Sequence, residues 1–204
     1  MPNKSWFQAR LKDPFLLKAR RENYRSRAAY KLQEINEKYR LIKPGQSLLD
    51  LGAAPGSWTQ IALEILRGKG KIIGVDLLDI DPIENAILLK GDIRDLQIQN
   101  EIRKLCPQGF DTIISDMAPN TTGVHHADTA NSAELVSLVL ELCPIFLKPG
   151  GSLAAKVFEG GEYKELHSKV KSMFGFAKSF NPKASLSKSR EVYIVAMNFQ
   201  NKQS

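Results

Sequence analysis

Four charged residues stand where apolar runs of the sequence begin, end or are interrupted. Asp116 ends FDTIISD, Lys156 interrupts LAAKVF, Glu191 precedes VYIVAMNF, and Lys31 lies in a helical segment near the start of the chain. Lysine and carboxylate side chains at one site can orient a substrate and move a proton, which is general acid–base chemistry. Lys156 alone could be a strand-end lysine whose amine reaches water. A buried amine without partners is costly, so converging carboxylates favour a functional site.

A cluster of small residues follows the first apolar run. In SLLDLGAAPGSW, the residues from Gly52 to Gly56 separate a strand from a helix that begins near Trp58. Small side chains let a ligand touch the backbone there, and a helix N-terminus offers free N–H groups. The two glycines do not form G-x-G-x-x-G, the pattern that accommodates a pyrophosphate. The loop therefore favours a nucleoside ligand without phosphates.

Two further aspartates end the next two apolar runs. Asp76 ends IIGVD and is placed for a ribose diol, and Asp92 ends LLKGD and could accept a hydrogen bond from an adenine amino group. Aspartate is also common where strands turn into helices, which is the structural interpretation of each. Together with Asp116, these residues place an acid at the end of three successive strands, which favours a ligand site over the structural interpretation. An adenosyl ligand without phosphates, bound at the ends of strands in a mostly parallel sheet, indicates S-adenosyl-L-methionine.

The elements that must position these residues alternate along the chain. Apolar runs (SLLDL, KIIGVDL, AILLKGD, FDTIISDM, SLAAKVF) are separated by helical segments at residues 58–66, 95–105 and 133–147. This alternation predicts parallel strands covered by helices on both faces. The sequence KPGG at residues 148–151 predicts the end of the last long helix and the turn into the next strand.

The end of the chain predicts one strand of opposite direction. A helix over residues 162–174 is followed by the strand AKSFNPK, a polar loop and the strand EVYIVAMNF. A loop of about seven residues is too short for a parallel crossover, so the last two strands should be antiparallel. We therefore expect an α/β, Rossmann-like fold with a mostly parallel seven-stranded sheet and one antiparallel strand. Upstream, residues 26–39 predict a helix capped by Ser26, with Lys31 beside its apolar face.

The charge of the chain is unevenly distributed. Residues 1–43 carry a net charge of +8, residues 44–160 carry −6 and residues 161–204 carry +5, which gives +7 for the chain. Basic ends with interleaved aromatic residues favour nucleic acid, although a solvated helix face is the simpler alternative. The loop at residues 185–190 is a further candidate for phosphate contacts. The candidates near the N-terminus are Lys4, Arg10, Lys12, Lys18, Arg20, Arg21, Arg25 and Arg27.

Several classes of protein are disfavoured by composition. Cys106 and Cys143 lie far apart, in none of the spacings of a zinc or redox site, so we expect no metal and a reducing cytoplasm. We expect His125 and His126 in a loop and His167 in an amphipathic helix, away from catalysis. No apolar run approaches the length of about 18 residues that spans a membrane, and the polar start lacks a secretory signal. Its lack of acids leaves a mitochondrial presequence as the weaker alternative.

Six motifs, in order along the chain, resemble the FtsJ family of RNA ribose 2′-O-methyltransferases. They are DLGAAPGSW, GVDLL, GDIRD, SDMAPNTTG, AAKVFEG and SREVYIVA, and the likeness extends over nearly the whole chain. The family pattern has two glycines before the tryptophan, and here Ser57 replaces the second. Because Gly56 remains, we expect cofactor binding to be retained.

This resemblance implies a function for the residues named above. The cofactor is expected to be S-adenosyl-L-methionine and the substrate the 2′-hydroxyl of a uridine ribose in 23S ribosomal RNA, with the large ribosomal subunit as partner and no membrane or obligate protein partner. We expect one domain over residues 1–204, with a basic RNA-binding extension and helix at 1–43, the catalytic sheet at 44–200 and a tail at 201–204. The implied catalytic residues are Lys31, Asp116, Lys156 and Glu191. The implied cofactor-binding residues are Gly52, Gly56, Trp58, Asp76, Asp92 and Asp116.

The role of Lys156 as proton acceptor makes a physical demand. A lysine base must be neutral, so its pKa would have to fall from about 10.4 to about 7 or 8. Lys31 and the cofactor sulfonium favour that fall, whereas Asp116 and Glu191 oppose it, and Lys156 could instead only orient the hydroxyl. Three alternatives remain: a transfer RNA 2′-O-methyltransferase, a non-catalytic ribosome-assembly factor, and a small-molecule methyltransferase, which the basic N-terminal segment disfavours.

Overall fold

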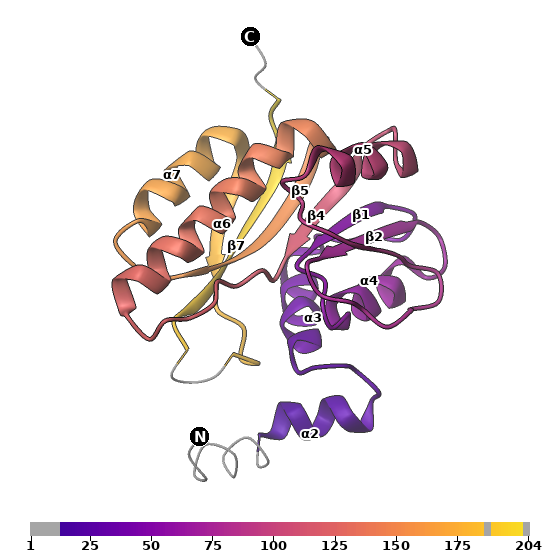
Figure 1. The fold of residues 1–204 in the computed structure, drawn as a ribbon, viewed down its shortest axis with the longest axis horizontal. Coiled ribbons are helices and arrows are strands. Elements are labelled where there is room, and N and C mark those ends of the chain that lie inside the picture. Colours follow the sequence, from indigo (N-terminus) through magenta and orange to yellow (C-terminus); the bar gives the residue numbers. More distant parts are fainter. Residues whose placement is uncertain (1–12, 186–188, 202–204) are drawn as a thin grey trace.

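Seven strands form one sheet in the order β3-β2-β1-β4-β5-β7-β6, in a computed structural model that describes residues 13–185 and 189–201 (Figure 1). Neighbouring strands are parallel except at β7, which runs antiparallel to both β5 and β6. The predicted fold class, a mostly parallel seven-stranded sheet with one antiparallel strand, is confirmed. The strands are β1 (Ser47–Leu51), β2 (Lys71–Asp76), β3 (Ile87–Lys90), β4 (Phe110–Ser115), β5 (Leu147–Phe158), β6 (Phe174–Phe180) and β7 (Glu191–Phe199).

Helices cover both faces of the sheet, as the uniformly apolar strands predict. In Figure 1, α5, α6 and α7 lie on one face and α3 and α4 on the other, and a separate apolar core forms under each group. The described helices are α2 (Pro14–Arg21), α3 (Ala28–Tyr39), α4 (Ser57–Leu66), α5 (Leu96–Leu105), α6 (His125–Phe146) and α7 (Tyr163–Met173).

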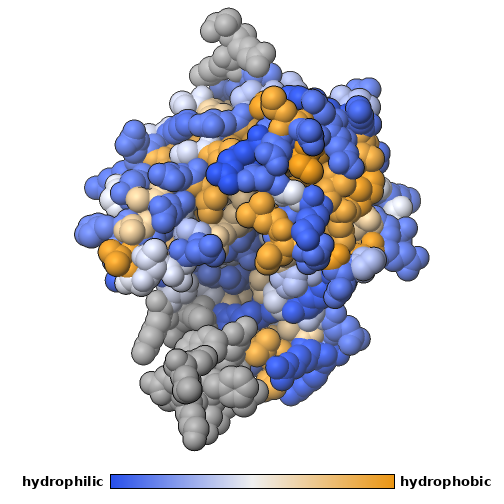
Figure 2. Space-filling model, in the orientation of Figure 1, coloured by the Kyte–Doolittle hydropathy of each residue, from blue (hydrophilic) through white to orange (hydrophobic). Residues whose placement is uncertain are grey.

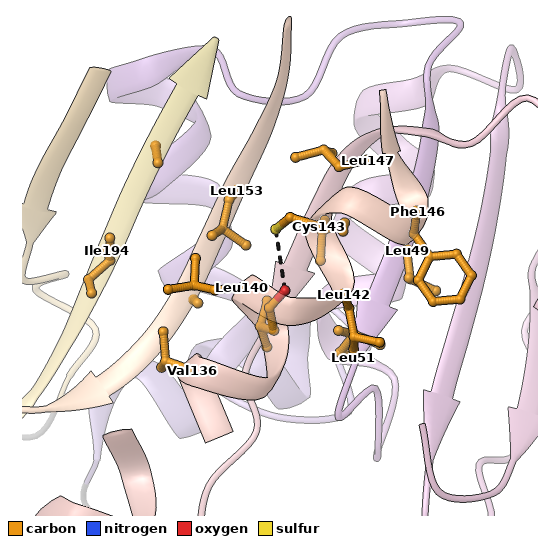
Figure 3. Packing of buried hydrophobic residues seen from close by; sticks show 14 of the residues in the cluster. Leu49, Leu51, Val136, Leu140, Leu142, Cys143, Phe146, Leu147, Leu153 and Ile194 are labelled. Atoms are coloured by element: carbon orange, nitrogen blue, oxygen red, sulfur yellow. Dashed lines mark hydrogen bonds between the residues drawn. The ribbon is translucent and has the colours of Figure 1, made fainter. Parts of the chain in front are cut away.

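Helix α6 contributes much of the core on its face of the sheet. Figure 3 shows its side chains, among them Leu140 and Cys143, beside Leu153 of β5 and Ile194 of β7. By length and composition α6 could cross a membrane, since its most apolar window has a mean hydropathy of 1.3. Half of that window is buried inside the fold, so its apolar residues are those of a core helix.

Helix α6 is longer than the sequence pattern predicts. It begins at His125 rather than at residue 133, so His125 and His126, predicted in a loop, belong to its first turn. The early start has a local cause, because the Asp128 carboxylate accepts the N–H groups of Thr122 (2.7 Å) and Gly123 (3.2 Å). A carboxylate in the first turn stabilises the positive end of the helix, and here it also holds the residues that precede the helix against its first turn.

Two strand boundaries also differ from prediction. Residues 148–151, predicted as a turn, lie inside β5, because Leu147 already pairs with Phe110 of β4 before the register shifts to the pair of Ser152 with Thr112. Strand β6 starts at Phe174 rather than at residue 177. It pairs along β7, which is inserted between β5 and β6, so the edge strand is β6 and not the last strand of the chain.

The N-terminal segment contains a helix that the sequence pattern did not predict. Helix α2 lies away from the sheet at the start of the described chain (Figure 1), and its Ala19 is buried in a small cluster with Tyr30 and Ala184. The Asp13 side chain caps α2 by accepting two N–H groups. The predicted Ser26 cap of α3 is displaced: Arg27 is the N-cap, and the Ser26 hydroxyl accepts the Ala28 N–H (3.1 Å).

Candidate active site and cofactor site

The strand order brings the predicted charged residues to one edge of the sheet. Asp116 directly follows β4, and Lys156 lies near the end of the neighbouring β5. Lys156 pairs in register with Tyr193 of β7, and Glu191 is the first residue of that strand. Because β7 is antiparallel, it starts where the parallel strands end, and this is the edge at which ligands bind in open α/β sheets.

Lys156 and Asp116 form the first of two ion pairs. Lys156 Nζ lies 3.0 Å from Asp116 Oδ1 and donates to the main-chain oxygen of the same residue at 2.6 Å. Lys156 is only 9% exposed. The buried amine therefore has the polar partners that its burial requires.

Lys31 and Glu191 form the second ion pair. Lys31 Nζ, which extends from α3, lies 2.5 Å from Glu191 Oε1, and the Ser185 hydroxyl donates to the same oxygen at 2.6 Å. Lys31 is 8% exposed. The structure thus places each carboxylate of the predicted tetrad beside one of its lysines.

Tyr193 connects the two ion pairs, and sequence reasoning missed it. Its hydroxyl donates to Asp116 Oδ1 at 2.7 Å, and Lys31 Nζ lies 5.8 Å from the centroid of its ring. The residue is fully buried. Its only signal in the sequence is a spacing of two from Glu191, which places both on the same face of a strand.

Tyr193 stays protonated at neutral pH. Burial, followed by the negative charges of Asp116 and Glu191, raises the pKa of its hydroxyl well above the ordinary value of 10. The hydroxyl is therefore a hydrogen-bond donor that fixes the Asp116 carboxylate, and not a base.

The loop between β1 and α4 has the open backbone that the small residues predict. Gly52 and Gly56 both have positive φ, of 73° and 107°. A Cβ added at Gly52 would lie 2.6 Å from the Met117 side chain, so only glycine fits between this loop and the end of β4.

Trp58, a predicted cofactor residue, has its side chain in the core. It is 2% exposed, its indole N–H donates to the Ala28 carbonyl at 2.8 Å, and its ring lies 5.6 Å from that of Tyr193. The side chain therefore does not form the surface of a cofactor site. Trp58 can contribute only its main-chain N–H, in the first turn of α4, where such groups have no intrahelical partner.

Asp76 is the last residue of β2 and Asp92 follows β3, so both lie at the same edge as the glycine loop. Asp76 accepts the N–H groups of Ala54 (2.9 Å) and Leu78 (2.8 Å), one on each of its oxygens, which leaves further lone pairs for ribose hydroxyls. Asp92 accepts from the Arg94 guanidinium, and these hydrogen bonds lower the pKa of its carboxyl. These hydrogen bonds therefore hold both carboxylates in fixed orientations, in which they can accept hydrogen bonds from a ligand.

Asp50, in β1, is a second residue that sequence reasoning missed. It is fully buried, and its Oδ2 accepts the Thr59 hydroxyl at 2.7 Å, whereas Oδ1 has no partner among the described residues. Burial raises the pKa of this carboxyl to about 7, against the Thr59 hydrogen bond, and the charges of Asp116 and Asp76 raise it further. Its burial could not be predicted from the sequence pattern, because Asp50 stands near the end of its strand like the other aspartates.

These features fit an adenosyl cofactor. The glycine loop admits a ligand against the backbone, Asp76 and Asp92 present acceptors beside it, and the unpartnered Asp50 oxygen lies in the strand directly before the loop. Positive charge on a ligand would be stabilised by three neighbouring carboxyl groups, those of Asp50, Asp76 and Asp116. Within residues 13–185 and 189–201, no group of three or more His, Cys, Asp or Glu is placed to hold a metal ion.

The predicted phosphate contacts fall into three groups. Lys4, Arg10 and Lys12 lie outside the described residues. Lys18, Arg20 and Arg21 are exposed on α2, where the surface seen in Figure 2 is mainly hydrophilic. The last two arginines are engaged within the protein, which disfavours them as phosphate contacts: the Arg25 guanidinium donates to three main-chain carbonyls, and Arg27 pairs with Asp13 and donates to the Ala184 carbonyl.

The profile of the family described as FtsJ-like methyltransferase matches residues 24–199. The "Ribosomal RNA large subunit methyltransferase E" of Methylobacillus flagellatus is 42% identical over 200 residues, which cover 98% of this chain and 97% of that protein. The protein of the same name from Legionella pneumophila is 40% identical over 97% of this chain and 96% of its own.

Solved structures agree with the family match. A Plasmodium falciparum protein described as a ribosomal RNA methyltransferase has a TM-score of 0.79 and 34% identity, over 86% of this chain and 98% of that one. Aeropyrum pernix fibrillarin, crystallised with bound S-adenosyl-L-methionine, has a TM-score of 0.56 and 19% identity over 83% of this chain and 73% of its own, which shows a shared fold. The chain therefore belongs to the FtsJ-like methyltransferase family, and it is an S-adenosyl-L-methionine-dependent methyltransferase.

Proposed function

We propose that the protein methylates the 2′-hydroxyl of a uridine ribose in 23S ribosomal RNA, in the cytoplasm and on the large ribosomal subunit. The observation that carries this proposal is the pair of lysine–carboxylate contacts joined by Tyr193 at the cofactor edge. The relatives named ribosomal RNA large subunit methyltransferases, which match nearly the whole chain, support the class of RNA.

The chemistry requires alignment and the removal of one proton. S-adenosyl-L-methionine supplies a methyl group on a sulfonium, so a C–O bond forms as the S–C bond breaks and S-adenosylhomocysteine is released. In this proposal, Lys156 Nζ orients the ribose hydroxyl and accepts its proton. Asp116, fixed by the Tyr193 hydroxyl, holds the Lys156 amine at 3.0 Å. Positioning of this kind supplies much of the rate of a displacement reaction.

Lys31 and Glu191 have a positioning role in the proposal. Their ion pair joins α3 to the start of β7, and Lys31 Nζ also lies 5.8 Å from the centroid of the Tyr193 ring. The four residues therefore act as a unit, and we expect the loss of any one to change the reaction more than it changes cofactor binding.

Other methyl acceptors fit the residues less well. Methylation at carbon 5 of a pyrimidine needs a cysteine nucleophile. Cys106 caps the C-terminal end of α5, and Cys143 is buried inside α6, where burial raises the pKa of its thiol to about 12. Methylation of an exocyclic amine is typical of enzymes with an aromatic residue in the turn after the fourth strand, whereas SDMAPN has none. The ribose hydroxyl remains the best-supported acceptor.

The choice of RNA is tested by following the label. The protein is incubated with methyl-labelled S-adenosyl-L-methionine and, separately, unmodified large ribosomal subunits, free ribosomal RNA and transfer RNA, and each RNA is digested to nucleosides. We expect label in 2′-O-methyluridine from the subunits. Label only from transfer RNA would replace the proposal with the transfer RNA alternative, and cofactor binding without transfer to any RNA would favour an assembly factor.

A further inference from the structure

Arg25 contacts both loops that surround the cofactor site. Its Nη1 donates to the carbonyls of Pro55 (2.8 Å) and Asp81 (2.8 Å), and its Nη2 donates to the carbonyl of Pro82 (2.9 Å). Pro55 belongs to the glycine loop between β1 and α4, whereas residues 81–82 belong to the loop that follows Asp76 and leads to β3. One side chain therefore connects two segments that meet at the adenosyl end of the site.

The packing around Gly56 shows how closely Arg25 approaches the cofactor loop. A Cβ added at Gly56 would lie 2.8 Å from Arg25 Nη1 and 2.7 Å from Ile83 Cδ1. Ile83 belongs to the same loop as the carbonyls that Arg25 binds. Glycine at this position thus leaves the space that the guanidinium occupies between the two loops.

The main chain around Arg25 is joined to α4 by further hydrogen bonds. The Gln60 side chain accepts the Arg25 N–H (2.9 Å) and donates to the Asn23 carbonyl (3.0 Å). The hydroxyls of Ser26 and Ser57 share a hydrogen bond of 2.6 Å, and Ser57 is 2% exposed. Ser57, which replaces a family glycine, therefore supplies a contact that glycine cannot make.

The other side of this linkage leads to the RNA-facing part of the molecule. Residues 22–27 join α2, with its exposed basic residues, to α3, which carries Lys31 of the catalytic group. A bound cofactor that orders the two loops also orders the carbonyls that Arg25 binds. Through Arg25, the cofactor would thereby favour one position of the segment between α2 and α3.

We infer that Arg25 is a positioning residue that couples cofactor binding to RNA binding. This inference rests on the proposed function and deepens it, since it concerns how the same site assembles. Coupling between two ligands is reciprocal, so RNA must tighten the binding of cofactor by the same factor as cofactor tightens the binding of RNA. The planar guanidinium is essential, because the single nitrogen of a lysine cannot reach three carbonyls on two loops in this geometry.

The experiment measures the affinity of the protein for S-adenosylhomocysteine, the product, with and without saturating unmodified large ribosomal subunits. For the wild type we expect the affinity to rise at least about fivefold when subunits are present, within the usual range of such couplings. For Arg25→Met we expect a ratio near one. For Arg25→Lys, which keeps the charge, we expect a ratio that stays well below that of the wild type.

Arg21→Met is the matched control, because it removes the same charge from exposed α2. It should weaken subunit binding equally with and without S-adenosylhomocysteine and leave the ratio unchanged. Ser57→Ala removes one contact of the same linkage and provides a second variant if Arg25→Met does not fold; its ratio should fall partway toward one.

A wild-type ratio of one with normal methylation, or full coupling in Arg25→Met or Arg25→Lys, overturns this inference alone. A wild type that neither binds nor methylates subunits overturns the proposed function and this inference with it.

Discussion

Tyr193 shows how one hydroxyl can organise a group of charged side chains. It is fully buried and donates to the carboxylate that holds Lys156. A hydrogen bond to a charged group contributes about 1.5 to 3 kcal/mol, and its loss would let Asp116 and Lys156 turn away from the reacting hydroxyl. The effect should therefore appear in the chemical step rather than in cofactor binding.

The corresponding variant is Tyr193→Phe, which keeps the ring. We expect kcat to fall by about tenfold or more, with the affinity for S-adenosylhomocysteine unchanged, as measured by steady-state methylation and by calorimetry. Tyr30→Phe is the control, because it removes a hydrogen bond to a carboxylate, that of Glu22 (2.8 Å), outside the site. An unchanged kcat in Tyr193→Phe would contradict the positioning role of the hydroxyl.

Gly52 and Gly45 both have a positive φ, but only Gly52 has neighbours close to an added Cβ. Alanine variants at the two positions therefore separate the effect of backbone strain from the effect of a steric clash. Gly52 has a φ of 73° and no room for a Cβ beside Met117, whereas Gly45 has a φ of 87° and open space around it. Gly52→Ala should lower cofactor affinity at least tenfold, because the displaced loop and Met117 border the site. Gly45→Ala carries the strain of a positive φ alone, about 1 kcal/mol, and should leave cofactor affinity unchanged. Equal affinities in the two variants, measured by titration, would argue against the glycine loop as the cofactor cradle.

At the scale of the elements, β1 contains a titratable group in the core. The pKa of the Asp50 carboxyl is raised to about 7, whereas an aspartate in an unfolded chain titrates near 3.9 and is ionised from pH 6 to 8. The folded state therefore binds more protons in this range than the unfolded state. Its stability must fall as the pH rises through 7.

Asp50→Asn removes this titration. From pH 6 to pH 8, the free energy of unfolding of the wild type should fall by about 1.4 kcal/mol relative to that of the variant, as measured by urea denaturation at each pH. The comparison with the variant cancels the titration of the histidines and other shared groups. Parallel pH profiles would show that Asp50 does not titrate in this range.

The sequence was sufficient for the order of the elements because apolar runs and helical segments alternate without ambiguity. It also predicted that Asp116 and Lys156 meet, since residues at the ends of parallel strands share one edge, but not that Glu191 pairs with Lys31 rather than with Lys156. It did not predict α2, a helix of eight residues inside a basic segment. The buried residue of this helix, Ala19, packs against Tyr30 and Ala184, which are distant in the sequence. Local patterns do not report such tertiary contacts.

The same limit explains why the orientation of single side chains was not predicted. The sequence shows the charge of Arg25 and Arg27 but not its direction, and in the structure both side chains donate to main-chain carbonyls. Trp58 lies next to the glycine loop, but its indole points into the core between α3 and β7. The residue types were informative, whereas their orientation depends on elements remote in the sequence.

At the scale of the whole molecule, the described basic residues of α2 form the end of the fold that we propose faces RNA. With Arg25 and Arg27 engaged inside the protein, Lys18, Arg20 and Arg21 on α2 are the described candidates for phosphate contact among those predicted near the N-terminus. Each phosphate contact to single-stranded RNA contributes about −0.7 to the slope of log affinity against log salt. RNA binding should therefore weaken as salt rises.

Replacing Arg20 and Arg21 by alanine should make that slope shallower by up to about 1.4. The control replaces Arg103 and Lys104, in the last turn of α5 and so near the start of β4, at the opposite edge of the sheet. That pair of changes removes the same charge and should leave the slope unchanged. A slope of zero in the wild type would contradict phosphate binding altogether.

The central claim, that this edge transfers methyl groups to a ribose hydroxyl through Lys156, is tested most directly in a single turnover. Wild type and Lys156→Met are each mixed with labelled S-adenosyl-L-methionine and unmodified large ribosomal subunits, and the nucleosides are separated. We predict 2′-O-methyluridine from the wild type and a rate at least about a hundredfold lower for the variant, with equal affinity of both for S-adenosylhomocysteine and for subunits. A variant that binds both normally and keeps the full rate, or label in a methylated base, would contradict the account.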